Sequence, residues 1–172
     1  MRKYLLHILI ISFLFLLAPT AQVASYAGAI EDAKEEVRKN PDDAAANYNL
    51  GYAYGNSGKY EEAIESHKQA LRIDPDYAMA HFFLGNAYYE LGKHEKAIES
   101  YKQAIRLDPD YALAHYNLGN AYGELDKYKE AIESFKQAIR INIDDAGAHN
   151  NLGVAYNNKE RNCYANLFDS CP

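Results

Sequence analysis

Small and apolar residues recur along this chain at helical spacing, and the whole pattern repeats every 34 residues. A leucine followed by glycine marks each repetition, at Leu50, Leu84, Leu118 and Leu152. Within residues 78–111, one helical stripe joins Leu84 to Tyr88 and a second joins Ala97 to Ala104. A fixed period of this length indicates a repeat architecture built from one small structural unit.

Glycine and proline divide each unit into two helices. Gly92 stands between the two stripes, where its tolerance of the left-handed conformation suits a helix end. Pro109 follows the second stripe and ends it, because proline cannot continue the hydrogen-bond ladder. The sequence therefore predicts a helix, a tight turn, a second helix and another turn in each unit. The predicted units are residues 44–77, 78–111 and 112–145, followed by a lone first helix at 146–158.

This pattern resembles the tetratricopeptide repeat family. In the unit 78–111 the resemblance rests on Leu84, Gly85, Ala87, Tyr88, Gly92, Ala97, Tyr101, Ala104 and Pro109. It covers about residues 44 to 158 without a gap. The resemblance implies an all-α fold, an α-solenoid in which antiparallel helix pairs form a right-handed superhelix. It also implies a protein that binds other proteins, catalyses no reaction and needs no cofactor.

Both ends of the array depart from the repeat. Residues 28–43 resemble a lone second helix, and we expect an N-terminal capping helix there, because a more polar helix suits the end of a solenoid. From Lys159 the pattern is lost, so residues 159–172 are expected to form an irregular tail, a short frayed helix or coil. A tail that folds back as a cap, and an array that continues in a longer relative, are the alternatives.

Three kinds of position inside the repeats carry structural expectations. The glycine of each Leu–Gly pair costs about 1 kcal/mol in a helix interior, so its recurrence suggests that two helices approach too closely there for a side chain. His67 takes the place of Tyr101 and Phe135, and we expect a partly buried histidine with its hydrogen bonds satisfied. Asp126 replaces the turn glycine, and a looser turn is expected because Asp tolerates the left-handed conformation less well.

The first 27 residues have the layout of a secretory signal peptide. A short basic start precedes an apolar run from Tyr4 to Ala18, and small residues follow it. The run is about 15 residues long, whereas a bilayer span needs ~20. We expect cleavage after Ala27 or, as the second choice, after Ser25; the alternative is an uncleaved anchor that tethers the repeats to a membrane. Either way the repeats are expected outside the cytoplasm, in the periplasm or secreted.

Charge and cysteine content narrow the class of partner. The 172-residue chain carries a formal net charge of −6. This charge argues against nucleic acid, whose phosphates require a basic face, and it disfavours an anionic membrane surface. The two cysteines, Cys163 and Cys171, lie near the C-terminus, where an exported protein can pair them in a disulfide. Two unpaired thiols in the tail are the alternative.

Each predicted first helix carries a second stripe, which in the family's superhelix lines a concave groove. Asparagine and tyrosine dominate this stripe. An Asn amide can pair with both the N–H and the C=O of a peptide group, and tyrosine supplies rigid contact area with one polar tip. Asparagines recur on either side of the Leu–Gly pairs, and Phe83 interrupts this ladder. The predicted peptide-binding residues are Tyr48, Asn49, Tyr52, Phe82, Phe83, Asn86, Tyr89, Tyr116, Asn117, Asn120 and Asn151.

Other constellations have plainer explanations. Family members that hold acidic chaperone C-termini use a Lys/Arg clamp on this stripe, and the matching places here carry no cation.

His81, His115 and His149 recur at the 34-residue period. Equivalent residues on neighbouring helices lie about 8–10 Å apart, whereas zinc holds each His nitrogen at about 2.0–2.1 Å. We therefore expect packing residues rather than a metal site.

The sequence thus predicts an exported, non-enzymatic scaffold that binds a protein partner, as an extended peptide or a helix, in the groove. The alternative is a structural module that self-associates into a homo-oligomer through its poorly capped C-terminal end. An enzyme, or the regulatory fragment of one, is a third class, which the absence of a catalytic constellation disfavours.

Overall fold

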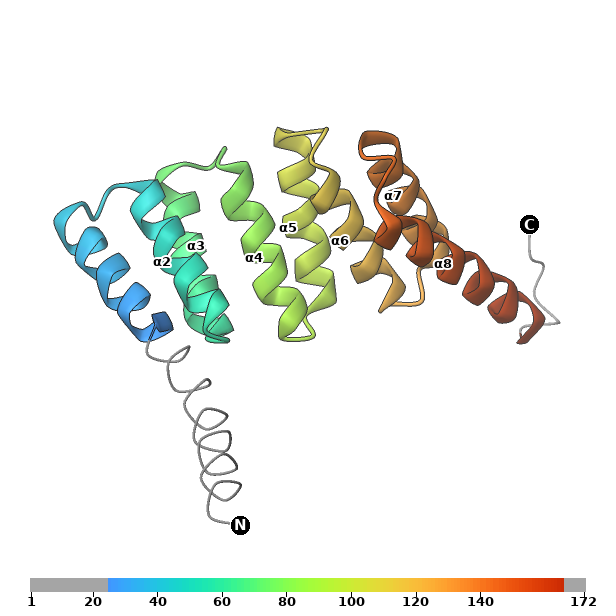
Figure 1. The fold of residues 1–172 in the computed structure, drawn as a ribbon, viewed down its shortest axis with the longest axis horizontal. Coiled ribbons are helices and arrows are strands. Elements are labelled where there is room, and N and C mark those ends of the chain that lie inside the picture. Colours follow the sequence, from blue (N-terminus) through green and yellow to red (C-terminus); the bar gives the residue numbers. More distant parts are fainter. Residues whose placement is uncertain (1–24, 166–172) are drawn as a thin grey trace, which may run out of the picture.

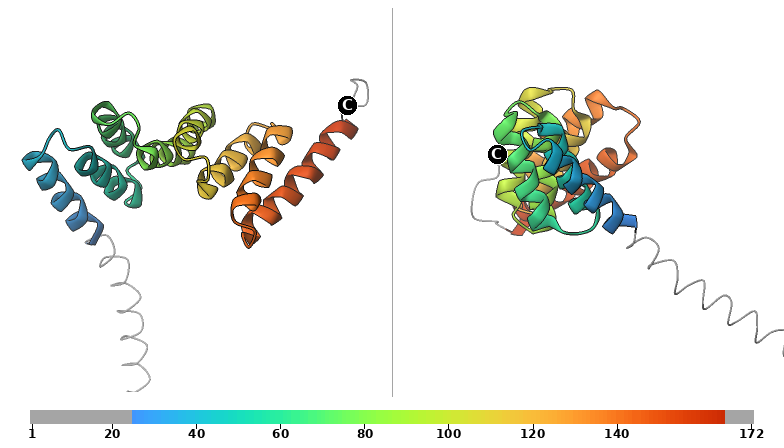
Figure 2. Two further views of the ribbon diagram at one scale, coloured as in Figure 1. Left: turned by 90° about the horizontal axis from the view of Figure 1, so that it is seen from above. Right: turned by 90° about the vertical axis from the view of Figure 1, so that its left-hand side faces the viewer.

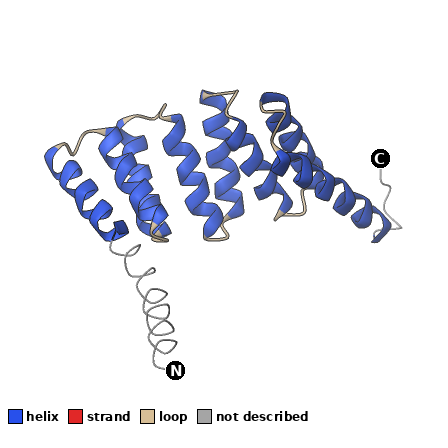
Figure 3. Cartoon of the chain, viewed as in Figure 1, coloured by secondary structure: helices blue, strands red, loops and turns tan. Residues whose placement is uncertain are grey.

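Helices joined by short turns make up the part of the chain that the structure describes (Figure 3). The structure is a computed structural model that describes residues 25–165, with side chains described through residue 162. A leading helix occupies residues 25–39. The helices that follow it are α2 (Ala44–Asn56), α3 (Tyr60–Ile73), α4 (Ala78–Glu90), α5 (His94–Leu107), α6 (Ala112–Gly123), α7 (Tyr128–Ile141) and α8 (Ala146–Ala165).

The helices follow one another along one long axis instead of closing around a common centre (Figures 1 and 2). Helices α2, α4 and α6 each pack against the helix that follows them, and α3, α5 and α7 also contact the first helix of the next unit. Each unit therefore contacts only its neighbours in sequence, which is the arrangement of a solenoid. The predicted all-α solenoid of helix pairs is confirmed.

The second helix of each unit buries one face and leaves the other to solvent. On α5, Ala97 and Ala104 are buried on either side of Tyr101. Helices α3 and α7 repeat this arrangement with His67 and Phe135 in the place of the tyrosine. Isolated helices of this length are marginal in water, so this burial supplies most of their stability.

The glycine of each of the first three Leu–Gly pairs faces a ring on the next helix. A Cβ atom built on Gly85 would lie 2.6 Å from Cε1 of Tyr101. Gly51 and Gly119 face the equivalent rings of α3 and α7 in the same way. The predicted close approach of two helices is therefore confirmed at these three positions.

The fourth glycine of this series is different, and the expectation of a close approach there is wrong. A Cβ atom on Gly153 would meet nothing within 4 Å in the part of the chain that the structure describes. The physical reason is that the described residues include no helix after α8, so no ring reaches this glycine.

The turn inside each unit contains a residue with positive φ. Gly92 has a φ of 68°, and Asp126, which replaces this glycine in the third unit, has a φ of 56°. The looser turn expected at Asp126 is wrong, because the N–H of Lys127 still donates to the C=O of Tyr122 at 3.0 Å, and the equivalent bond after Gly92 is 2.9 Å. The Asp126 carboxylate also accepts a hydrogen bond from the hydroxyl of Tyr128, which helps to hold the turn.

The three periodic histidines attach the start of their helices to the preceding turn. Nε2 of His81 lies 3.0 Å from the carbonyl oxygen of Pro75. His115 and His149 make the same contact, each at 3.0 Å, one and two units further on. Within the described residues, no group of three or more His, Cys, Asp or Glu side chains could hold a metal ion.

The last helix is longer than the sequence predicted. Helix α8 continues to Ala165, so the expectation of an irregular tail is wrong for residues 159–165. Neither glycine nor proline occurs between Gly153 and Pro172. The local sequence therefore contains no strong helix stop where the earlier units turn.

Several predictions about the two ends lie outside the described residues. Residues 1–24, which include most of the predicted signal peptide, are among them, while the two predicted cleavage positions, Ser25 and Ala27, belong to the leading helix. Cys171 also lies outside, so its disulfide with Cys163 stays a prediction. No helix in the described range is both long enough and apolar enough to cross a membrane.

Candidate functional site

One face of the solenoid, formed mainly by α2, α4, α6 and α8, is hollowed by two pockets, and we call this face the groove. The first pocket has a volume of about 440 Å³ and lies between the first two units, reaching α6. The second pocket has a volume of about 220 Å³ and lies between the last units, from α4 to α8. Cavities of a few hundred cubic ångströms are large enough to take a ligand or the side chains of a partner.

Seven of the predicted peptide-binding residues line these pockets. In the first pocket they are Tyr52, Phe83, Asn86, Tyr89, Asn117 and Asn120. In the second pocket they are Tyr89, Asn120 and Asn151. The structure thus brings these seven side chains to one face, and their role in binding stays a prediction.

The prediction of Phe82 as a peptide contact is wrong. Phe82 is 5% exposed and belongs to the core, where its ring lies 4.8 Å from that of Tyr111 and 5.9 Å from that of Tyr101. Consecutive residues of an α-helix point about 100° apart. Phe82 therefore faces the core, while its neighbour Phe83 faces the groove.

Three further predicted contacts line neither pocket. Asn49 is exposed on α2. Tyr48 is half-buried, with its ring 5.7 Å from that of Phe83. The ring of Tyr116 packs 5.8 Å from that of Phe135. The structure therefore places none of these three residues at a pocket of the groove.

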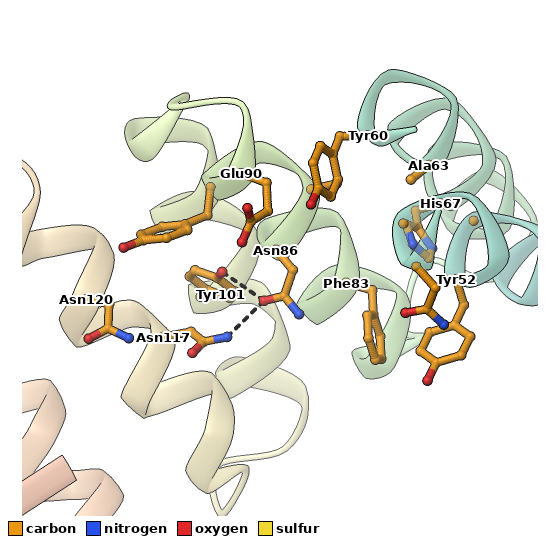
Figure 4. A pocket seen from close by; sticks show the side chains of 15 residues that line it. Tyr52, Tyr60, Ala63, His67, Phe83, Asn86, Glu90, Tyr101, Asn117 and Asn120 are labelled. Atoms are coloured by element: carbon orange, nitrogen blue, oxygen red, sulfur yellow. Dashed lines mark hydrogen bonds between the residues drawn. The ribbon is translucent and has the colours of Figure 1, made fainter. Parts of the chain in front are cut away.

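Asparagines on neighbouring first helices bond to one another. Nδ2 of Asn117 donates to Oδ1 of Asn86 at 2.9 Å, and Nδ2 of Asn151 donates to Oδ1 of Asn120 at 2.9 Å. The hydroxyl of Tyr101 also donates to Oδ1 of Asn86, at 2.9 Å (Figure 4). The asparagines of the ladder therefore link successive units to each other.

These bonds limit what the amides can offer to a ligand. Oδ1 of Asn86 already accepts two hydrogen bonds, which occupy its two lone pairs and leave this residue only its Nδ2 donors. Asn151 uses Nδ2 to donate both to Asn120 and to the hydroxyl of Tyr116. The expectation that each amide pairs with the N–H and the C=O of a peptide group together is therefore wrong at Asn86 and Asn151.

An aromatic pair replaces the amide pair between the first two units. The amide pairs join residues 31 positions apart. The same spacing joins Tyr52 to Phe83, whose ring centroids lie 5.1 Å apart with an interplanar angle of 88°. Aromatic rings favour this edge-to-face arrangement. The break in the ladder at Phe83 is therefore matched by Tyr52, and together they give the first pocket an apolar wall.

His67 forms part of the wall of the first pocket, and the expectation of a partly buried, satisfied histidine is wrong. It is 1% exposed, and its Nδ1 atom is buried without a hydrogen-bond partner in the described part of the chain. Its ring stacks on that of Phe83, with the centroids 6.2 Å apart. Burial lowers the pKa of His67 to about 4, because an apolar environment disfavours the charged imidazolium.

Two carboxylates are the charged groups of the groove. Among the described residues, Glu90 is the one charged residue that lines the first pocket, and Glu124 is the one that lines the second. They stand at the same position of successive units, and the hydroxyl of Tyr89 donates to Glu124 at 3.4 Å. Their 34-residue spacing is visible in the sequence. Both also fall on the helical stripe that the sequence assigns to the groove, four residues after Asn86 and Asn120.

The groove has the composition of a contact surface. Across the described residues that line it, aromatic rings and amides surround two separate carboxylates, and no nucleophile is held against a base. Such a surface offers shape and hydrogen-bonding groups to a ligand.

Stacked helix pairs with glycines packed against rings and one hollowed face define a helical-repeat protein. A family model described as "TPR repeat" matches residues 56–92 and 85–126. Two models described as "Tetratricopeptide repeat" match residues 112–145 and 33–65. Together the matches span more than half of the chain. The chain belongs to the tetratricopeptide repeat family.

Solved structures show the same architecture. The crystal structure of MamA is 31% identical, with a TM-score of 0.76 over 80% of this chain and 80% of that chain. The first TPR of Spaghetti (RPAP3), bound to the HSP90 peptide SRMEEVD, is 25% identical, with a TM-score of 0.66 over 67% of this chain and 91% of that chain.

The second TPR domain of human RPAP3, in complex with the HSP70 peptide SGPTIEEVD, is 28% identical. Its TM-score is 0.64 over 66% of this chain and 94% of that chain. A comparison with curated proteins gave no match.

Proposed function

We propose that this protein is a non-enzymatic scaffold that binds an extended peptide segment of another protein in the groove. The observation that carries the proposal is the continuity of the two pockets, which share Tyr89 and Asn120 and so form one track from the first unit to α8. A single side chain or small molecule would fill one pocket, whereas an extended chain can occupy both.

The groove contains hydrogen-bond donors for the backbone carbonyl groups of an extended chain. Asn86 keeps its Nδ2 donors, and Asn120 accepts one bond through Oδ1, which leaves its own amide hydrogens to donate. Both can donate to backbone carbonyl groups of a peptide. Tyr52 is 44% exposed and supplies a ring for side-chain contact. The two RPAP3 domains with similar folds hold peptides, which supports peptide binding as the use of this fold here.

Panning the full chain against displayed random dodecapeptides provides the test. We expect selected peptides whose affinity falls about tenfold in Tyr52→Ala and in the double variant Asn117→Ala/Asn120→Ala. Glu99→Ala, on the exposed face of α5, is the control that leaves the affinity unchanged. Thermal unfolding of each variant checks the fold, because the asparagines also link helices. Failure to select any peptide, or equal affinity in both groove variants, would overturn the proposal.

We further infer that the protein is exported, from the basic start and apolar run in residues 1–27. N-terminal sequencing of the protein from fractionated cells tests this inference. A new N-terminus at residue 26 or 28 in an exported fraction supports cleavage. An intact N-terminus in a membrane fraction supports the anchor, and an intact N-terminus in the cytoplasm contradicts export.

Self-association is the second candidate function, and one observation favours it. Rings cover Gly51, Gly85 and Gly119, whereas Gly153 faces open space among the described residues. Tyr156, one helical turn further along the same face, is 42% exposed. We propose that a second copy can cover this face of α8, with its leading helix in the place that a second helix takes in the earlier units.

Sedimentation of the purified chain over a range of concentrations tests this candidate. If the open face of α8 is the contact, the chain forms oligomers and Gly153→Lys reduces them to monomers. A strict monomer at high concentration, or oligomers that Gly153→Lys does not affect, excludes this interface.

A further inference from the structure

The groove carries an unbalanced negative charge. Among the described residues, no lysine or arginine lines either pocket, and neither Glu90 nor Glu124 takes part in an ion pair. His67 adds no charge near neutral pH, since burial lowers its pKa to about 4. The first pocket therefore combines a neutral wall with one free carboxylate.

Four cations of the repeat units have acidic partners outside the groove. Nζ of Lys68 lies 3.0 Å from Glu65, and Nζ of Lys136 lies 2.9 Å from Glu133. Arg140 pairs with Asp110 across two units at 3.6 Å. These pairs are exposed and weak, and none of their cations lines either pocket of the groove.

Several aromatic rings line the first pocket together with its one carboxylate. Figure 4 shows Glu90 toward Tyr60 at one end of the pocket, and Phe83 toward Tyr52 at the other end. Ring faces attract ammonium and guanidinium groups. The chain makes this contact elsewhere, since Nζ of Lys96 lies 5.7 Å from the ring centroid of Tyr88. A carboxylate at the rim of an aromatic pocket is therefore suited to a long side chain with an apolar stem and a cationic end.

We propose that the first pocket binds a lysine or arginine side chain of the partner peptide, with Glu90 as its counter-ion. The inference rests on the proposed peptide binding and adds the chemistry of the partner. The stem of the side chain contacts Tyr52 and Phe83, while Asn86 donates to the peptide backbone. The acidic peptides SRMEEVD and SGPTIEEVD on the two RPAP3 domains would instead bring carboxylates toward Glu90, and this chain disfavours them.

Three pools of capped heptapeptides test the proposal on the full chain, with lysine, norleucine or glutamate fixed at the centre and random small residues around it. Norleucine keeps the alkyl stem of lysine and removes its charge. We expect the lysine pool to bind about tenfold more tightly than the norleucine pool, and the glutamate pool to bind most weakly. Added salt should weaken the lysine pool most.

Two variants with the same change in net charge locate the effect. Glu90→Gln preserves side-chain size and should remove the preference for lysine while the norleucine pool keeps its affinity. Glu99→Gln, on the exposed face of α5, should leave the preference intact. Helicity and thermal unfolding of both variants verify the fold.

Equal binding of the lysine and norleucine pools, or a lysine preference that survives Glu90→Gln, would overturn the proposed counter-ion and leave groove binding in place. Failure of all three pools to bind, together with failure of the panning, would overturn peptide binding itself. The two results are distinguishable, because only the second affects the uncharged pool.

Discussion

At the scale of single residues, the same glycine has different roles in successive units. Gly85 lies against Tyr101, and a Cβ atom there would lie 2.6 Å from the ring. Gly153 occupies the same place in its unit and faces open space among the described residues. Glycine occupies this position in every unit, but only a ring packed against it, such as that of Tyr101, excludes a larger residue.

Alanine substitution at these two positions should therefore have opposite effects. Gly85→Ala forces the Tyr101 ring to move and should destabilise the fold by about 1–3 kcal/mol. Gly153→Ala improves helix propensity without a clash and should stabilise α8 by up to ~1 kcal/mol. Thermal unfolding of both variants in dilute solution measures the difference, and changes of the same sign in both would contradict it.

His67 should give the fold a dependence on pH. Its pKa is about 4 in the folded chain, against an ordinary value of 6.5. As the pH falls below 6.5, the unfolded chain takes up a proton that the folded chain does not, so stability is complete above that pH and is lost toward pH 4. The loss is at most about 3 kcal/mol.

The variant His67→Phe isolates this contribution, because Phe135 already fills the same position against Gly119. Denaturant unfolding at several pH values should show a smaller loss of stability below pH 6.5 in the variant than in the natural chain. Parallel curves for the two proteins would show that His67 does not contribute.

At the scale of helices, short polar and aromatic contacts between successive first helices hold the units in register. Asn86 and Asn117 are joined by a hydrogen bond of 2.9 Å, and Tyr52 and Phe83 by a ring contact of 5.1 Å. Direct packing between first helices is sparse compared with packing inside a pair. These side-chain contacts are therefore expected to couple neighbouring units.

A double-mutant cycle on Asn86→Ala and Asn117→Ala should reveal that coupling. We expect the effects on unfolding free energy to be non-additive by about 1 kcal/mol, since either substitution alone already breaks the shared bond. The exposed Asn49 provides the control, because Asn49→Ala and Asn86→Ala should be additive. Additivity in both cycles would mean that the ladder does not link the units.

At the scale of the whole molecule, stability should vary along the solenoid. Each unit is stabilised by its neighbours, and the described residues place no partner helix beyond α8. Helices α4 to α6 have neighbours on both sides. The ends therefore depend on fewer contacts than the centre.

Amide hydrogen exchange should follow this gradient. We expect the slowest exchange in α4, α5 and α6 and faster exchange in α8, above all in residues 159–165, which extend past the repeat unit. Mass spectrometry of proteolytic fragments resolves the helices. Uniform protection along the chain, or the strongest protection in α8, would contradict this picture of the fold.

Much of the fold was predictable because its determinants are local and repeated. The turn residue at Gly92 indicates one short loop, and the stripe through Ala97 and Ala104 indicates one helix face. The 34-residue period then shows that the same unit is repeated. The end of α8 was not predictable in this way. The repeat pattern ends at Lys159, but the helix continues, because neither glycine nor proline follows before Pro172 to end it.

The candidate site was predictable only as a face. Stripe positions in the sequence located Tyr52, Asn86 and Asn120 on the groove, but the same logic wrongly included Phe82. Helical geometry predicts the direction in which a side chain points. Whether that side chain is exposed or buried depends on its neighbours in other segments, such as Tyr111 against Phe82.

The sequence by itself determined the helices, their order and their stacking, because helical periodicity and turn chemistry act between residues close in the chain. Only the tertiary structure decided which amides are free and that Tyr52 pairs with Phe83. It also decided that, among the described residues, Nδ1 of His67 is buried without a partner and Glu90 is the one charged residue that lines the first pocket. These properties arise between residues 15 to 35 positions apart in adjacent helices, where distance and burial set the interaction, and no local pattern encodes them.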